Sequence, residues 1–207
     1  MTQSLFLAFL AVITALLLSP GPSVWLAIHN GLTHGVRGAL IGVLGNVTAF
    51  QGLMAVSALS LSAMVQIAAP TLWLMQYGGA AYLAYLGIRL LTTPVGAATH
   101  GPENGAGPTR AWRLFRQAFL VTASNPKALM FVVALLPQFV DPARPLLPQW
   151  GLMALTTAMV HLCVYWGYAV LGHRASAYLM DRRIRRLYNG ASGLLFLGFA
   201  VGWLLLA

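Results

Sequence analysis

Long apolar runs recur along the whole chain and are separated by short polar segments. A membrane-spanning helix needs about 20 predominantly apolar residues, and the runs reach this length. The pattern therefore predicts an all-α polytopic membrane protein. Its six predicted transmembrane helices are residues 4–30, 37–62, 71–92, 112–138, 148–172 and 187–206.

The longest polar segment, residues 93–111, is rich in glycine and proline and predicts a flexible linker. It divides one transmembrane domain, residues 1–207, into two halves of three helices, 1–92 and 112–207. Because three is odd, the second half begins on the opposite side of the membrane from the first. If the halves share a fold, they form an inverted-topology repeat.

Composition and charge sharpen this picture. Of the 207 residues, 59% are hydrophobic and only 7% charged, against roughly 25% charged in a soluble domain. The net charge of +9 is explained by basic cytoplasmic loops, so nucleic acid is not an expected partner. Ten basic residues fall on one side of the predicted topology: Arg37, Arg89, Arg110, Arg113, Arg116, Arg174, Arg182, Arg183, Arg185 and Arg186. Only Arg144 falls on the other side, so we expect both termini outside the cytoplasm.

Each half opens with a long apolar segment that proline interrupts. Pro20 and Pro22 lie in the first predicted helix, and Pro126 lies in the fourth. Proline removes a backbone donor and unwinds a helix, and freed backbone groups are tolerated in a membrane mainly where they line a cavity. Broken helices at corresponding places in two inverted halves indicate the central site of a transporter. The half-helices that follow the breaks would point positive dipole ends toward a carboxylate.

Lys127 directly follows the second break. A straight helix from Trp112 would place it ~22 Å from the cytoplasmic boundary. Such a charge costs about 2.5–3.5 kcal/mol on insertion scales and indicates function. The acids Glu103, Asp141 and Asp181 all lie in predicted loops. We therefore expect Lys127 to bind either a substrate carboxylate or carbonyls near Asn125; the alternative is a side chain that snorkels to the outer interface.

No acidic residue lies within a predicted helix. If protons drive transport, His29, His161 or Lys127 must carry them. The alternative is that each histidine is a packed polar residue. No cofactor is expected.

Glycines spaced four residues apart predict close helix packing. The pairs are Gly31 with Gly35, Gly38 with Gly42, and Gly198 with Gly202.

Ordered motifs over essentially the whole chain resemble the LysE/RhtB family of amino-acid exporters. They are Ser19-Pro20-Gly21-Pro22-Ser23-Val24; Gly31, Gly35, Arg37 and Gly38; residues 79–89; Asn125-Pro126-Lys127 through Pro137-Gln138-Phe139-Val140; and Asn189, Gly190, Ser192 and Gly193. The resemblance implies a carrier of the bacterial inner membrane that expels amino acids or related metabolites, in exchange for protons and with a possible homodimeric assembly.

The resemblance also indicates the cargo. Members that export basic amino acids have an aspartate where this chain has Asn46, and an uncharged residue in place of Lys127. We therefore expect a neutral amino acid such as threonine, homoserine or a branched aliphatic one. Gln51 is a further candidate for contacting the substrate amine or side chain. The predicted substrate-binding residues are Ser19, Pro20, Gly21, Pro22, Ser23, Asn46, Asn125, Pro126, Lys127 and His161.

Three other classes remain as alternatives. Gly190-Ala191-Ser192-Gly193 matches an intramembrane serine protease motif, but the required histidine would lie on a later helix and no histidine follows His173. A metal-ion exporter is disfavoured because the five histidines are scattered, with no i,i+4 pair or adjacent acid. A channel or a purely structural membrane protein is the third class.

Overall fold

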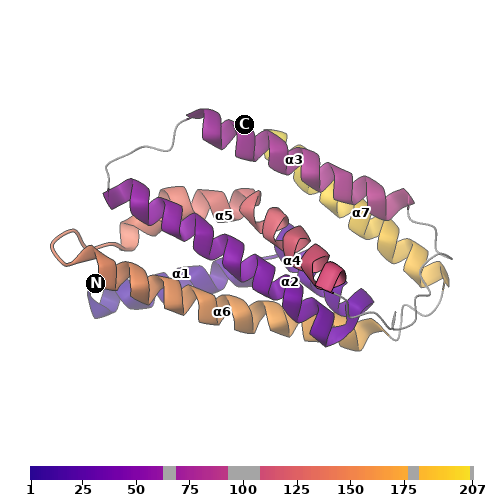
Figure 1. Ribbon diagram of the computed structural model, residues 1–207, viewed down its shortest axis with the longest axis horizontal. Helices are drawn as coiled ribbons and strands as arrows, with labels where there is room; N and C mark the ends of the chain where they lie inside the picture. Colours follow the sequence, from indigo (N-terminus) through magenta and orange to yellow (C-terminus); the bar gives the residue numbers. More distant parts are fainter. Residues whose placement is uncertain (63–68, 93–107, 177–181, 206–207) are drawn as a thin grey trace.

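The computed structural model describes residues 1–62, 69–92, 108–176 and 182–205, and within these ranges the chain is helical and forms no strand. The elements are α1 (Gln3–Leu18), α2 (Pro22–Ser62), α3 (Ala69–Thr92), α4 (Pro108–Ala123), α5 (Pro126–Met130), the π-helix η1 (Phe131–Leu135), the 3-10 helix η2 (Leu136–Phe139), α6 (Leu146–Ala175) and α7 (Arg182–Leu205) (Figure 1). Residues 93–107 of the predicted linker, with Glu103 and Asp181, lie outside the described residues.

The chain folds back on itself inside α2. Gly35 has φ 68° and ψ 179°, a left-handed backbone conformation that favours glycine. A Cβ on Gly42 would lie 2.6 Å from Nδ2 of Asn30, so these two residues face each other. In a straight helix they would be about 18 Å apart. Residues 22–34 and 36–62 are therefore two antiparallel segments, and the turn lies in the gap between the first two predicted helices.

The predicted interruptions coincide with helix ends. The helix α1 begins with Thr2, whose hydroxyl accepts a hydrogen bond from the Leu5 amide, and ends at Leu18. The helix α2 then begins at Pro22. In the second half, α4 ends at Ala123 and α5 begins at Pro126.

Close helix packing depends on some of the predicted glycines. A Cβ on Gly31 would overlap the carbonyl of Ala169 on α6. Gly172, which is not in any of the predicted pairs, lies at the same contact, where a Cβ would overlap the carbonyl of Ile28 on α2. Gly198 and Gly202 behave otherwise, since a Cβ at either position meets no atom within 4 Å among the described residues. The expectation that this pair brings helices together within the chain is wrong, because α7 packs against α3 through Gly193 instead.

The outer surface of the bundle is apolar. Leu59, Leu155, Leu171 and Leu194 are each more than half exposed. Among the described residues, Pro22–Leu59 and Leu146–Ala175 are long and apolar enough to cross a membrane, although the first of them turns back at Gly35. The N-terminus and the start of α6 lie at the same end of the molecule (Figure 1). A lipid environment accounts for the exposed leucines.

Candidate functional site

The first break leaves two carbonyls without their helical donors. Pro20 and Pro22 have no N–H, so the carbonyls of Leu16 and Leu18, four residues earlier, cannot be bonded in the usual way. Both carbonyls are bonded by side chains from the second half of the chain. Lys127 Nζ donates to Leu16 O at 2.9 Å, and the Tyr168 hydroxyl donates to Leu18 O at 2.7 Å. Side chains of α5 and α6 thus supply the hydrogen-bond donors that the end of α1 lacks.

Lys127 makes a second bond at the same place. Its Nζ donates to Ser19 O at 2.6 Å. Gly21 lies beside the ammonium group, since a Cβ at this position would be 3.4 Å from the Lys127 nitrogen. The carbonyls that bind Lys127 therefore belong to the first break, and the expectation of carbonyls near Asn125 is wrong in this respect. The side chain points toward the end of α1.

At the second break, the carbonyl that loses its helical donor is hydrogen-bonded by a neighbouring residue of the same segment. Pro126 deprives Thr122 O of its helical donor, and the Asn125 amide takes this place with a 3.1 Å bond. The side-chain oxygen of Asn125 then caps α5 by accepting from the Lys127 amide at 3.0 Å. Its Nδ2 donates to Ser23 Oγ, also at 3.0 Å. Asn125 thereby joins the start of α5 to the start of α2.

A buried polar network continues from this contact. The Thr122 hydroxyl donates to Asn46 Oδ1 at 2.7 Å, and its oxygen lies 3.0 Å from Ser23 Oγ. Ser23, Asn46, Thr122 and Asn125 are all at most 2% exposed. Buried polar groups are stable when they are hydrogen-bonded, so this network fixes α2, α4 and the second break relative to one another.

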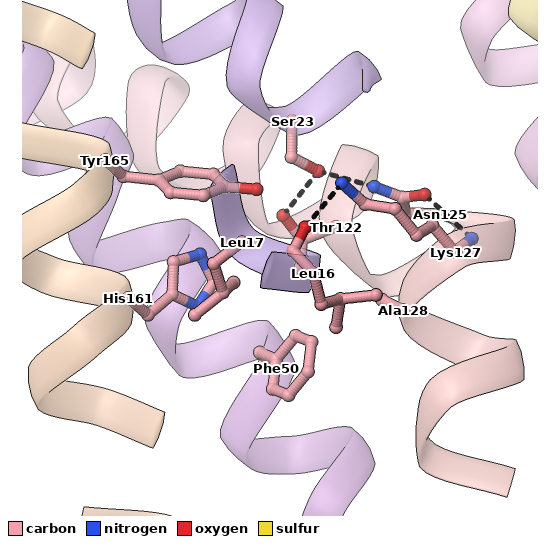
Figure 2. A pocket seen from close by; sticks show the side chains of 10 residues that line it. All are labelled: Leu16, Leu17, Ser23, Phe50, Thr122, Asn125, Lys127, Ala128, His161 and Tyr165. Carbon is pink, nitrogen blue, oxygen red and sulfur yellow. Dashed lines mark hydrogen bonds between the residues drawn. The ribbon is translucent and has the colours of Figure 1, made fainter. Parts of the chain in front are cut away.

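The network forms one wall of a small cavity (Figure 2). The cavity has a volume of about 10 Å³, about what one water molecule requires. Its polar lining consists of Ser23, Thr122, Asn125, Lys127, His161 and Tyr165, and its apolar lining of Leu16, Leu17, Phe50 and Ala128. Figure 2 shows Tyr165 and His161 extending from α6 toward this space, opposite Ser23 and Asn125.

Four of the predicted site residues line the cavity: Ser23, Asn125, Lys127 and His161. Ser19, Pro20, Gly21, Pro22 and Pro126 form the two breaks beside it. Asn46 lies behind the wall, bonded to Thr122. Gln51 is engaged elsewhere, since its Nε2 donates to Ala154 O at 3.1 Å. His29 is also remote from the lining and contacts Tyr188, with Nδ1 and the hydroxyl 3.3 Å apart.

Sequence reasoning assigned no role to Thr122, Phe50 or Tyr165. Each had a signal in its spacing, because residues four apart share a helix face. Thr122 precedes Pro126 by four residues, Phe50 follows Asn46 by four, and Tyr165 follows His161 by four. Leu16 and Leu17 have the same spacing, four residues before Pro20 and Gly21, whereas Ala128 has no such signal.

Thr122→Val should destabilise the folded protein by about 1–3 kcal/mol, because Asn46 and Ser23 would lose a buried hydrogen-bond partner. Thr157→Val is the matched control. Thr157 is 0% exposed, and its hydroxyl has no hydrogen-bond partner within the described part of the chain. The control should therefore be neutral or slightly stabilising. Thermal unfolding in detergent measures both, and equal losses would contradict the role given to the network.

Comparison with known proteins places the chain in a family. The family model described as LysE type translocator matches residues 14–206. An uncharacterized membrane protein of Vibrio cholerae is 31% identical over 195 residues, covering 93% of each chain. A homoserine/homoserine lactone efflux protein of Salmonella typhimurium is 32% identical over 197 residues, covering 95% of this chain and 94% of the relative.

A leucine efflux protein of an Enterobacter species is 27% identical over 187 residues, covering 89% of this chain and 88% of the relative. No solved structure matches the chain. The family match covers nearly the whole described bundle, including both breaks and the residues that line the cavity. The chain belongs to the LysE family of translocators and is a transporter, not an enzyme.

Proposed function

We propose that this protein exports neutral amino acids across the bacterial inner membrane by proton-coupled antiport, with alternating access to the cavity between its two halves. The names of the relatives support the cargo class, since one is a homoserine/homoserine lactone efflux protein and another is a leucine efflux protein. The family match supports a membrane transporter.

The observation that carries the proposal is that both helix breaks meet at one cavity. Lys127, from the second half, binds carbonyls of the first break, and Asn125 binds Ser23 at the start of α2. The lining residues come from both halves of the chain. A site at the junction of two halves can be exposed to either side of the membrane when the halves move against each other.

The size of the cavity favours such a movement. About 10 Å³ is far too small for an amino acid, so binding requires the lining helices to move apart. The Lys127 ammonium and the start of α2 would hold the substrate carboxylate, because a cation and the N-terminus of a helix both attract an anion. Asn46 and His161 remain our candidates for contacting the amine and side chain of the substrate.

The charge of the site favours neutral cargo. The described lining carries the Lys127 ammonium and no carboxylate. Asn46, directly behind the wall, is uncharged as well. A lysine or arginine substrate would add a side-chain cation to the α-ammonium group that all amino acids carry, and no carboxylate of the described lining could pair with it, which is strongly unfavourable.

Further parts of this proposal are the six-helix inverted repeat with both termini outside, the homodimer, and protons carried by His29, His161 or Lys127. The distribution of basic residues and the helix break in each half support the topology.

A Cβ on Gly198 or Gly202 would meet no described atom within 4 Å, so this face of α7 has room for a second copy of the chain. A reporter fused after residue 207 should be active outside the cytoplasm; a cytoplasmic reporter would contradict the inverted repeat. Cross-linking in membranes tests the dimer.

Counterflow in proteoliposomes tests the transport function. Vesicles loaded with unlabelled homoserine should accumulate labelled homoserine or leucine transiently, and lysine should not accumulate. A pH gradient should drive net movement, and an ionophore that dissipates the gradient should abolish it. Equilibration without stimulation by internal substrate would indicate a channel and contradict the proposal.

A further inference from the structure

His161 differs from its polar neighbours in the cavity because its ring is buried without a hydrogen bond. The side chain is 0% exposed, and neither Nδ1 nor Nε2 has a hydrogen-bond partner among the described residues. On the opposite wall, the Ser23 hydroxyl is bonded to the side chains of both Thr122 and Asn125. Figure 2 shows the imidazole directed toward the cavity from α6.

Aromatic packing holds the ring in this orientation. The Phe50 ring lies edge-on to it with centroids 5.6 Å apart, and the Tyr165 ring does so at 4.2 Å. These contacts fix the position of both nitrogens without satisfying either of them. A buried polar group that lacks a partner is unfavourable, and a ligand that supplies the partner regains this free energy.

The two unpaired nitrogens of His161 determine which chemical group of a substrate can bind beside them. A neutral imidazole presents one donor and one acceptor. A hydroxyl group can pair with either nitrogen because it both donates and accepts, whereas a methyl group of the same size can pair with neither. Lys127 lines the same cavity and is the group suited to a carboxylate. His161 is therefore available for the amino-acid side chain.

We propose that His161 determines substrate specificity by selecting a hydroxyl-bearing side chain over an isosteric aliphatic one. This inference rests on the proposed function and narrows it to neutral amino acids with a short hydroxylated side chain. Phe50 and Leu17 enclose the remaining carbon atoms of such a side chain. Leucine would leave the imidazole unpaired and would be a poorer substrate.

Two matched pairs of substrates test the proposal: homoserine against norvaline, and threonine against valine. In each pair a hydroxyl replaces a methyl group. In proteoliposomes the wild-type protein should prefer the hydroxylated member at least about tenfold, which corresponds to one buried hydrogen bond of ordinary strength. His161→Leu should reduce this preference to roughly twofold or less, and His161→Gln should retain part of it.

Thr157→Val is the control variant, because Thr157 lies one helical turn away on α6, is buried and does not line the cavity. Its preference should equal that of the wild type. An equal fall for all four substrates in His161→Leu would mean that the imidazole contacts the common ammonium group, and would overturn the proposal. A wild-type protein without any preference would overturn it even if no variant folds. Absence of transport for all four neutral amino acids would instead contradict the proposed function.

Discussion

Lys127→Met is expected to lower the export rate of neutral amino acids on the order of a hundredfold. Methionine keeps much of the length and apolar character of the lysine stem but removes three donors and the charge. The carbonyls of Leu16 and Ser19 would lose a charge-assisted bond, and the substrate carboxylate would lose its cation. A loss of about 3 kcal/mol corresponds to this factor. Initial rates of counterflow, normalised to the amount of protein in the vesicles, measure it.

Two comparisons separate substrate binding from stability. Tyr168→Phe removes the donor to Leu18 O from the same helix end without altering the charge of the site. It should lower the unfolding temperature and leave intact the discrimination between amino acids and their amides, which lack the carboxylate. Lys127→Met should lose that discrimination, and Lys127→Arg should keep part of it. Export by Lys127→Met and Lys127→Ala at the wild-type rate would exclude a carboxylate clamp.

Gly172→Ala is expected to cause a large loss of stability although it adds only a single methyl group. A Cβ at this position would overlap the carbonyl of Ile28, which is backbone and cannot move without displacing α2. Forcing an extra carbon into a close helix contact typically costs about 1–3 kcal/mol. The reciprocal variant Gly31→Ala should behave alike, since its Cβ would overlap the carbonyl of Ala169 on α6.

Gly167→Ala, on the same helix, is the matched control. A Cβ there meets no atom within 4 Å among the described residues, so alanine should fit and should favour the helix slightly. Thermal unfolding of the detergent-purified variants measures the difference. If Gly167→Ala and Gly172→Ala unfold at the same temperature, the close contact between α2 and α6 does not govern stability.

The positions of the two helix breaks followed from the sequence because proline acts locally. The breaks at Pro20 and Pro126 needed no knowledge of distant contacts. The partners of Lys127 could not be predicted in the same way. They depend on the packing of α5 against the end of α1, which brings together residues 111 positions apart.

The wall of the cavity was likewise only partly predictable. Ser23 and Asn125 are short polar residues directly beside the proline breaks, so a sequence pattern can identify them. Leu16, Leu17 and Ala128 line the cavity only because of how the helices cross. The unpaired state of His161 is a further tertiary property, since it depends on what surrounds the ring.

The hydrogen bonds to the carbonyls of Leu16 and Leu18 can form only late in the synthesis of the chain. Their donors, Lys127 and Tyr168, are synthesised more than a hundred residues later. An emerging first half cannot complete its own broken helix, so these groups must stay in contact with water or with the insertion machinery until α6 arrives. We expect the fragment comprising residues 1–92 to insert without acquiring the native break, and co-expression of residues 108–207 to restore it.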